Sequence, residues 1–364
     1  MKKFKRTVTF FLALCLTLSL SVMSASASTF IDAHGNEIEL DDTLEAYSSV
    51  VLTGANDAAR KGETNLGDLW TDALRWFAVS GKINEYFDED DIAAGNTKID
   101  VDADHIVALW NGGNLRADIA EGKFGAAELA QVLPYPNKVA IVYMSGAQLL
   151  EALEAAAQGL PYSEASAAAC ASFMQVSGLT YSVNADKAFD KGEVYKDPWS
   201  KANSVQRVSI EGVNGKAFDT AATYAVITSN ANFNGMDSSY VFKAAAEANE
   251  KSAITTAVVR DIVWMYIDEQ LENMVGEAYA APQNRITVTA TEQPAAPVQP
   301  AKPASSGEAS QSGEYTVVRG DSLWKIASKV YGSGSLWGKI FRANPQVKDA
   351  SMIYVGQKLV IPAK

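Results

Sequence analysis

The chain has 364 residues, enough to bury at least one large core and to form two or three domains. Its hydrophobic fraction of 48% is ordinary for a soluble globular protein. With 43 acidic against 31 basic residues, the net charge is −12, which argues against nucleic acid as a partner.

Residues 1–27 have the three parts of a secretory signal peptide. Four basic residues come first, an apolar run extends from Val8 to Val22, and Ala25-Ser26-Ala27 supplies a small-residue cleavage site. The run is shorter than the roughly 20 residues of a membrane-spanning helix, and Leu14 precedes Cys15 where a lipidated cysteine follows a small residue. We therefore expect cleavage and secretion, no membrane span, and a net charge of −16 for the mature chain.

After an N-terminal segment at 28–44, the pattern of residues 45–289 predicts one α+β domain, here called the body. Short β-rich runs occupy 106–110, 138–144, 179–183, 205–210 and 224–228. Helical periodicity covers 65–79, 145–158 and 255–274. The apolar stripe of the last helix indicates core packing rather than a cofactor site.

A turn of unusual composition follows the strand that ends at Trp110. Asn111-Gly112-Gly113 lets the backbone turn and approach a ligand closely, and Arg116 then supplies a planar fork suited to phosphate or carboxylate oxygens. The alternative is an ordinary turn at the end of a strand, with a surface arginine.

The chain has two histidines, which limits metal chemistry. His34 lies in a polar turn without partner ligands. His105 follows three aspartates at 100, 102 and 104, but the spacing does not fit an EF-hand, and a solvated acidic loop is the favoured interpretation. Cys170 is the one mature cysteine, so no intramolecular disulfide forms, and we interpret it as a small buried hydrophobe. We predict no metal, no cofactor and no catalytic residue.

Residues 290–313 hold four prolines among Ala, Ser, Gly and Gln and are predicted to be a linker. Beyond it, residues 314–364 carry eight basic and three acidic residues, a charge of +5, which leaves −21 for residues 28–313. A basic tail on an acidic body suggests that the tail meets an anionic surface. In this tail we expect a strand at 315–318, a helix capped by Asp321 or Ser322, a second helix at 336–343 and a strand at 358–361.

Five segments of the body occur in the order found in the C-terminal, substrate-binding domain of the 5'-nucleotidase and UDP-sugar hydrolase family. They are ETNLGDLWTDALRW at 63–76, IVALWNGGNLR at 106–116, VLPYPNKVAIVYMSGAQLLEALE at 132–154, FMQVSGLTYSV at 173–183 and YAVITSNANFNGMDSSYVF at 224–242. The body resembles this domain over roughly residues 45–289.

This resemblance implies ligand-binding roles for particular residues. Arg60 and Arg116 would contact a phosphate, Asn111 would bond the ligand, and Gly113 belongs to the same turn. Tyr135 stands where the family has one of two aromatics that sandwich a base, an arrangement in which stacking contributes about 1 to 3 kcal/mol per base. The alternative for Tyr135 is a core aromatic. Asp237 matches the aspartate that caps the family's last loop; on the residues alone it is simply a turn residue.

The sequence departs from the family at several positions of this site. Ala231 replaces the second stacking aromatic, which leaves half of the sandwich unless Phe233 swings in. Three glycines of the family pattern are also replaced; they correspond to Asn114, Met236 and Ser238. Full-length members carry an N-terminal metallophosphoesterase domain, whereas about thirty residues separate the cleavage site from Arg60. We therefore expect that domain to be missing.

The tail resembles the LysM module nearly from end to end. Similar modules bind N-acetylglucosamine-containing glycans in a shallow groove between the strand–helix loop and the loop after the second helix. The resemblance places six residues near the sugar: Gly320, Asp321, Ser322, Leu323, Asn344 and Pro345. It assigns four others to the core: Trp324, Ile326, Ile340 and Ile361. A small basic interaction domain of another specificity is the alternative.

These observations lead to three hypotheses for a secreted protein that its LysM tail tethers to peptidoglycan. In the first, the body binds a nucleotide-like or other phosphorylated small molecule without catalysing hydrolysis alone. In the second it serves a 5'-nucleotidase-type hydrolysis in nucleotide catabolism, alone or with a separate metallophosphatase. In the third it is a structural interaction scaffold of the cell wall.

Overall fold

The computed structural model describes residues 28–31, 37–40, 45–55, 57–290, 313–317, 323–331, 337–344, 346–347 and 357–362. The chain divides into two compact units, Met1–Gln293 and Pro294–Lys364. The predicted signal peptide, His34 and almost all of the predicted linker lie outside the described residues.

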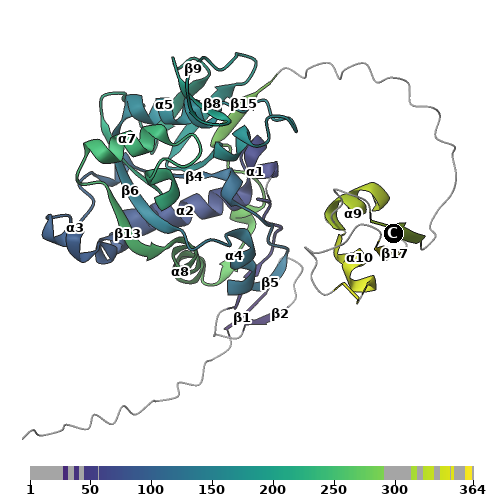
Figure 1. The fold of residues 1–364 in the computed structure, drawn as a ribbon. Coiled ribbons are helices and arrows are strands. Elements are labelled where there is room, and N and C mark those ends of the chain that lie inside the picture. The colour runs from purple at the N-terminus through teal and green to yellow at the C-terminus, as the bar shows by residue number, and fades with distance from the viewer. Residues whose placement is uncertain are drawn as a thin grey trace, which may run out of the picture. The chain divides into compact units, whose positions relative to one another are not determined.

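A mixed five-stranded sheet is the centre of the body (Figure 1). Its order is β13 (Ala253–Val258), β6 (Lys138–Ser145), β12 (Thr223–Ser229), β4 (Ile106–Asn111) and β7 (Met174–Ser177). β12 runs parallel to β4 and antiparallel to β6, while β13 and β7 pair antiparallel at the two edges. The predicted α+β fold is confirmed.

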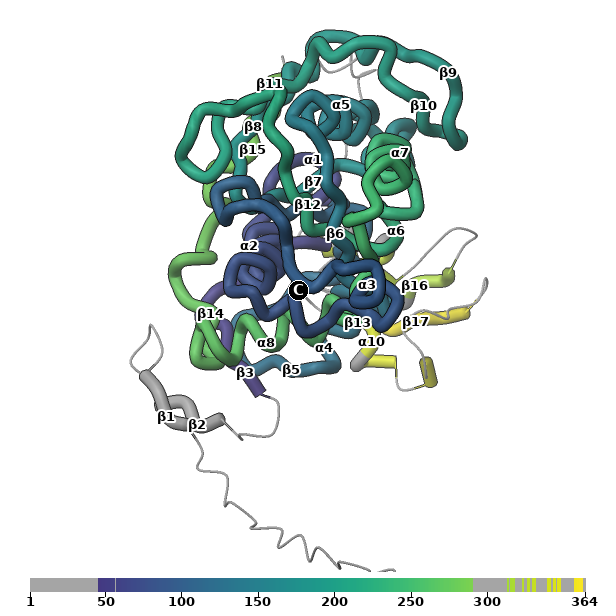
Figure 2. The backbone as a smooth tube through the Cα atoms, turned by 90° about the vertical axis from the view of Figure 1, so that its left-hand side faces the viewer, coloured from purple at the N-terminus to yellow at the C-terminus, as the bar shows by residue number. Residues whose placement is uncertain are grey.

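Alternate residues of the sheet enter two separate cores, one on each face. Ala108 and Trp110 of β4 belong to a core shared with α2 (Asn65–Val79) and α8 (Val259–Leu271). Val107 and Leu109 belong to a core shared with α5 (Gly146–Ala156) and α7 (Tyr240–Ala248). Figure 2 shows α2 and α7 on opposite sides of β6 and β12. Because both faces are covered, every residue of β4 is buried, which explains its continuous apolar run.

Capping hydrogen bonds mark the N-termini of α2 and α5, which pack on the sheet. Thr64 precedes α2 and accepts a hydrogen bond from the Gly67 amide at 3.1 Å. Ser145 and Gln148 form a reciprocal capping box at the start of α5. The predicted bounds of α2 are confirmed, and α5 begins and ends within two residues of its prediction.

Two predicted elements differ from the structure. The helix predicted at 255–274 is a strand, β13, followed by α8, because the β-branched run from Ile254 to Val258 pairs with β6 at the edge of the sheet. The strand predicted at 205–210 is β11 (Val208–Val213). It begins after the buried Arg207, whose guanidinium donates hydrogen bonds to the carbonyls of α5's C-terminal loop at 2.7 and 3.0 Å.

Smaller sheets surround the central one. β8 (Leu179–Asn184) pairs with β11 and with β15 (Ile286–Thr289), and β9 (Lys191–Lys196) forms a hairpin with β10 (Trp199–Ala202). β3 (Glu45–Ser48) lies between β5 (Gly122–Gly125) and β14 (Met274–Val275), and β1 (Ser28–Ile31) pairs with β2 (Glu37–Leu40). The short helices are α1 (Asp57–Lys61), η1 (Lys82–Tyr86), α3 (Glu89–Ala93), η2 (Ala103–His105), η3 (Gly112–Asn114), α4 (Ala126–Val132), η4 (Ala169–Ser172), α6 (Asn230–Phe233) and η5 (Glu277–Tyr279).

The second unit has the predicted βααβ order. β16 (Gly313–Thr316) pairs antiparallel with β17 (Lys358–Ile361), and α9 (Leu323–Tyr331) and α10 (Trp337–Ala343) lie between them in the sequence. Of the predicted core residues, Ile326, Ile340 and Ile361 are buried in one cluster, and the side chain of Trp324 lies outside the described residues. Across both units, the part of the chain described contains no helix that is long and apolar enough to span a membrane.

Candidate functional site: a cationic pocket beside the β4 turn

The turn after β4 brings the chain against two other backbone segments. A Cβ atom at Gly112 would lie 2.6 Å from the carbonyl carbon of Ala59 in α1, and one at Gly113 would lie 2.5 Å from the carbonyl oxygen of Ala171 in η4. The close approach predicted for these glycines is therefore made to the protein's own backbone, and a ligand contact at Gly113 stays a prediction. This packing fixes α1, which carries Arg60, beside the end of β4.

Side chains at the end of β4 form a hydrogen-bonded chain with Asp237. The buried amide of Asn111 donates to Asp237 Oδ2 at 3.3 Å, and Asn114 Nδ2 donates to Asn111 Oδ1 at 2.8 Å. Asp237 has a φ of 54°, which belongs to the left-handed region that aspartate tolerates in turns. The end of β4 and the distant Asp237 are thus held in one polar cluster.

Three cations lie near enough to Asp237 to act on its charge. Burial raises the pKa of Asp237, and the positive charges of Arg60, Lys196 and Arg116 act in the opposite direction. Arg60 donates from NH1 to the Ala167 carbonyl at 3.1 Å, while its buried Nε has no hydrogen-bond partner. The structure therefore brings the predicted Arg60, Arg116 and Asp237 together.

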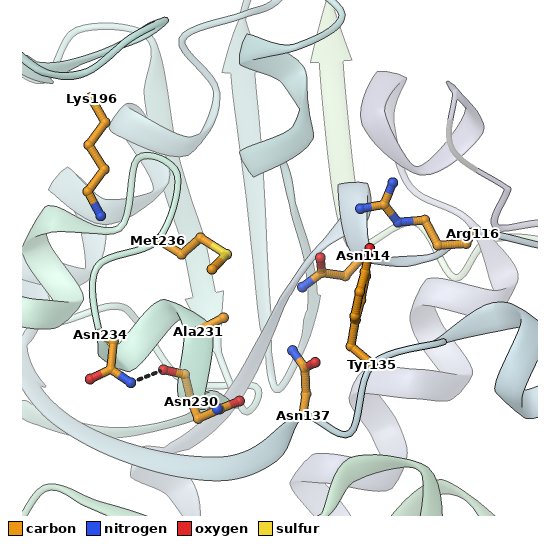
Figure 3. Close-up of a pocket in the computed structure, with 9 residues that line it drawn as sticks. All are labelled: Asn114, Arg116, Tyr135, Asn137, Lys196, Asn230, Ala231, Asn234 and Met236. Carbon is orange, nitrogen blue, oxygen red and sulfur yellow. Dashed lines mark hydrogen bonds between the residues drawn. The ribbon is translucent and has the colours of Figure 1, made fainter.

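A pocket of about 540 Å³ opens next to the cluster (Figure 3). Nine residues line it: Asn114, Arg116, Tyr135, Asn137, Lys196, Asn230, Ala231, Asn234 and Met236. Figure 3 shows Tyr135 on one side, Ala231 and Met236 on the other, and Asn114 and Asn137 between them. Of the predicted ligand residues, Arg116 and Tyr135 line the pocket directly.

The aromatic wall of the pocket has a single ring. Tyr135 is 56% exposed, so the alternative that it is a core aromatic is wrong. Phe233 is half-buried against the core shared with α5 and α7 and does not line the pocket. Tyr135 is accordingly the one aromatic among the described lining residues, and Ala231 and Met236 lie across the pocket from it (Figure 3).

Lys196 is a pocket residue that sequence analysis missed. It comes from β9, and its Nζ donates to the Gly235 carbonyl at 2.6 Å beside the Tyr195 hydroxyl, which donates to the same oxygen at 2.9 Å. Gly235 has a φ of +73°, a conformation that favours glycine. The β9–β10 hairpin therefore holds the loop that carries Met236 and Asp237, a contact that no local sequence pattern signals.

The acidic segment before β4 lies at the surface. Asp100 pairs with Lys251 and Asp104 with Lys216, and the His105 ring lies 5.5 Å from that of Tyr224. These contacts agree with a solvated acidic loop. In the described segments, no three His, Cys, Asp or Glu residues are grouped so as to hold a metal ion.

Cys170 is 1% exposed within the core shared with α5 and α7, and burial raises the pKa of its thiol. Its interpretation as a small buried hydrophobe is confirmed.

The LysM residues predicted near a glycan fall into two groups. Gly320, Asp321, Ser322 and Pro345 lie outside the described residues. Leu323 is 2% exposed, and Asn344 is fully buried, with its side chain bonded to the Ile340 carbonyl and to both the amide and the carbonyl of Val360. The side chains of Leu323 and Asn344 thus serve the core, and a glycan contact at either residue would be made by its backbone.

Comparison with known families decides the relationship of both units. The model of the 5'-nucleotidase C-terminal domain matches residues 44–247, more than half of the chain. The chain belongs to this family. A LysM domain matches residues 315–362, so the predicted resemblance is confirmed for both units. The body continues beyond the family match, since α8, β14 and β15 are part of the same unit.

Two characterised sequences, YfkN and Kbp, are similar to different parts of the chain. The trifunctional nucleotide phosphoesterase protein YfkN of Bacillus subtilis is 30% identical over 223 residues, which are 60% of this chain and 13% of YfkN. The potassium binding protein Kbp of Escherichia coli is 51% identical over 49 residues, which are 13% of this chain and 33% of Kbp. The chain thus spans no more than a third of either relative.

Among solved structures, a 5'-nucleotidase precursor from Thermus thermophilus is similar with 26% identity and a TM-score of 0.47, over 67% of this chain and 39% of that one. The NAD nucleotidase of Haemophilus influenzae is similar with 13% identity and a TM-score of 0.45, over 72% and 48% of the two chains.

Proposed function

We propose that this is a secreted, cell-wall-associated protein whose body binds a nucleotide-like or other phosphorylated small molecule without catalysing hydrolysis alone. The LysM domain supports binding of N-acetylglucosamine-containing glycans such as peptidoglycan. In this proposal the LysM tail tethers the body to the wall, and the pocket beside the β4 turn holds the ligand.

The main observation behind the proposal is that the Arg116 side chain has no described partner. Arg116 is an exposed residue that lines the pocket, and no side-chain hydrogen bond or ion pair engages it within the described residues. By contrast, Arg285 of the same body is paired with Asp72 at 2.8 Å. An unpaired guanidinium at the wall of a pocket offers a planar fork of donors that suits phosphate oxygens.

The charge distribution supports the same class of ligand. Residues 28–313 carry a net charge of −21, yet both charged residues that line the pocket, Arg116 and Lys196, are cations, and together with Arg60 they act on the nearby Asp237. Local cations in an otherwise acidic surface favour a small anion that contacts them directly. A large polyanion would meet the surrounding negative charge instead.

A thermal-shift screen of the full chain tests the proposal. Nucleotides, nucleosides, UDP-sugars and inorganic phosphate would be added with and without divalent metals, followed by a phosphate-release assay on each compound that binds. A rise in melting temperature with phosphorylated compounds but not with nucleosides supports the proposal. If no phosphorylated compound stabilises the protein or binds saturably, the proposal fails.

Family membership favours a second candidate, a 5'-nucleotidase-type hydrolase in nucleotide catabolism, alone or with a separate metallophosphatase. The name of the relative YfkN, a trifunctional nucleotide phosphoesterase, supports this candidate. Phosphate release by the purified chain with Mn²⁺, Zn²⁺ or Mg²⁺ would establish it and overturn the binding-only proposal. Release only after addition of a metallophosphatase would favour the two-component version.

A further inference from the structure

Four asparagines line the pocket, and hydrogen bonds within the protein engage one amide atom in each of three of them. Asn114 and Asn234 each donate from Nδ2 at 2.8 Å within the protein, which leaves Oδ1 available as an acceptor. Asn230 accepts a backbone amide through Oδ1 at 3.1 Å, which leaves Nδ2 as a donor. Within the described chain, the side chain of Asn137 makes no hydrogen bond and offers both atoms.

The asparagines of the pocket thus keep both acceptors and donors free. A hydroxyl group both donates and accepts a hydrogen bond, so several neighbouring hydroxyls would satisfy these amides together. Because none of these amide atoms is buried without a partner, their free positions face the pocket or solvent. The arrangement fits a ligand with many hydroxyl groups.

The apolar surfaces of the pocket favour a ring that stacks on one side only. Tyr135 presents one exposed ring, while Ala231 and Met236 on the other side present a methyl group and a flexible thioether. A nucleobase gains most when aromatic rings cover it, because each of its faces is a π surface. A pyranose packs its C–H face on a single ring and directs its hydroxyls outward around its edge.

We propose that the ligand is a phosphorylated sugar rather than a nucleotide. The sugar ring lies on Tyr135, its hydroxyls bond the four asparagines, and its phosphate pairs with Arg116. This inference rests on the proposed function, because it requires that the pocket binds a phosphorylated molecule, and it adds the chemical class of the remainder.

Calorimetric titration of the full chain with glucose 1-phosphate, AMP and inorganic phosphate tests the inference. We expect glucose 1-phosphate to bind at least tenfold more tightly than the other two. Asn137→Ala should weaken the binding of glucose 1-phosphate about tenfold and leave the binding of inorganic phosphate unchanged, because the substitution removes only contacts to sugar hydroxyls. Asn203→Ala, an exposed asparagine after β10, is the matched control and should change neither affinity.

A second variant tests the single aromatic wall. Ala231→Phe should strengthen the binding of AMP about tenfold relative to that of glucose 1-phosphate, because the phenylalanine supplies a second stacking surface. Tighter binding of AMP than of glucose 1-phosphate to the natural chain would overturn the inference and leave the proposed function standing. Equal weakening of glucose 1-phosphate and inorganic phosphate in Asn137→Ala would also overturn it. Failure of all three compounds to bind would overturn the proposed function itself.

Discussion

Replacing Gly112 with alanine should destabilise the body through a backbone clash. The new Cβ would lie 2.6 Å from the carbonyl carbon of Ala59, whereas carbon atoms in contact prefer about 3.5–4.0 Å. Since the Gly112 amide also donates to the Phe173 carbonyl at 2.7 Å, the turn cannot move away from α1 without losing that bond. The clash therefore has to displace α1, and Arg60 with it.

Overpacking of this kind costs about 1–3 kcal/mol, and we expect the upper end because backbone lies on both sides. For a domain of this size about 3 kcal/mol lowers the melting temperature by roughly 6–12 °C. Circular dichroism melts of Gly112→Ala and of the control Gly62→Ala, whose Cβ meets nothing within 4 Å, measure the effect. Equal melting temperatures for the two variants would refute the packing argument.

Three further predictions concern buried polar groups. Burial raises the pKa of Asp68 to about 8, above its ordinary 3.8, so the folded state keeps a proton that the unfolded state releases. The stabilisation from protonated Asp68 is complete below pH 4 and is lost as the pH rises to 8. Asp68→Asn should therefore flatten the decline in the free energy of unfolding, measured by urea titration, between pH 5 and 8. An unchanged decline in the variant would show that Asp68 is not its cause. Arg285→Ala should lower the free energy of unfolding in urea by about 3–5 kcal/mol because it leaves the partly buried Asp72 carboxylate without its cation, and a loss below about 1 kcal/mol would show that Asp72 finds another partner. Asn344→Ala should lower the stability of the LysM domain by about 1–3 kcal/mol, because it removes the side-chain hydrogen bonds to Val360, and should reduce retention on peptidoglycan at elevated temperature. Normal stability with lost retention would instead place Asn344 in direct glycan contact.

The sequence predicted those helices and strands that neighbouring residues alone determine. The apolar run of β4 and the helical periodicity of α2 predicted both elements at nearly the observed bounds. β13 was missed because its β-branched residues also fit the helical periodicity of the segment that follows, and pairing with β6 decides between the two. The boundary therefore depends on tertiary structure.

The candidate site divides in the same way. Arg116 follows its strand directly and could be recognised beside the turn. Lys196 enters the pocket from a hairpin eighty residues further along the chain, so its role depends on the contact with the Gly235 carbonyl. The glycines of the turn were predicted to let the backbone approach a ligand, which stays a prediction; the backbone segments of α1 and η4 that they approach are defined only by the fold.

The most direct test of the central claim is a calorimetric titration of the full chain and its Arg116→Ala variant with the phosphorylated compound that gives the largest thermal shift. Loss of one charge-assisted contact should weaken binding at least tenfold, and the melting temperature should not change, because Arg116 has no described side-chain partner to lose. Lys216→Ala, which removes an exposed cation paired with Asp104 before the start of β4, is the control and should bind like the natural chain. Undiminished binding by Arg116→Ala would contradict the assignment of the phosphate to this pocket.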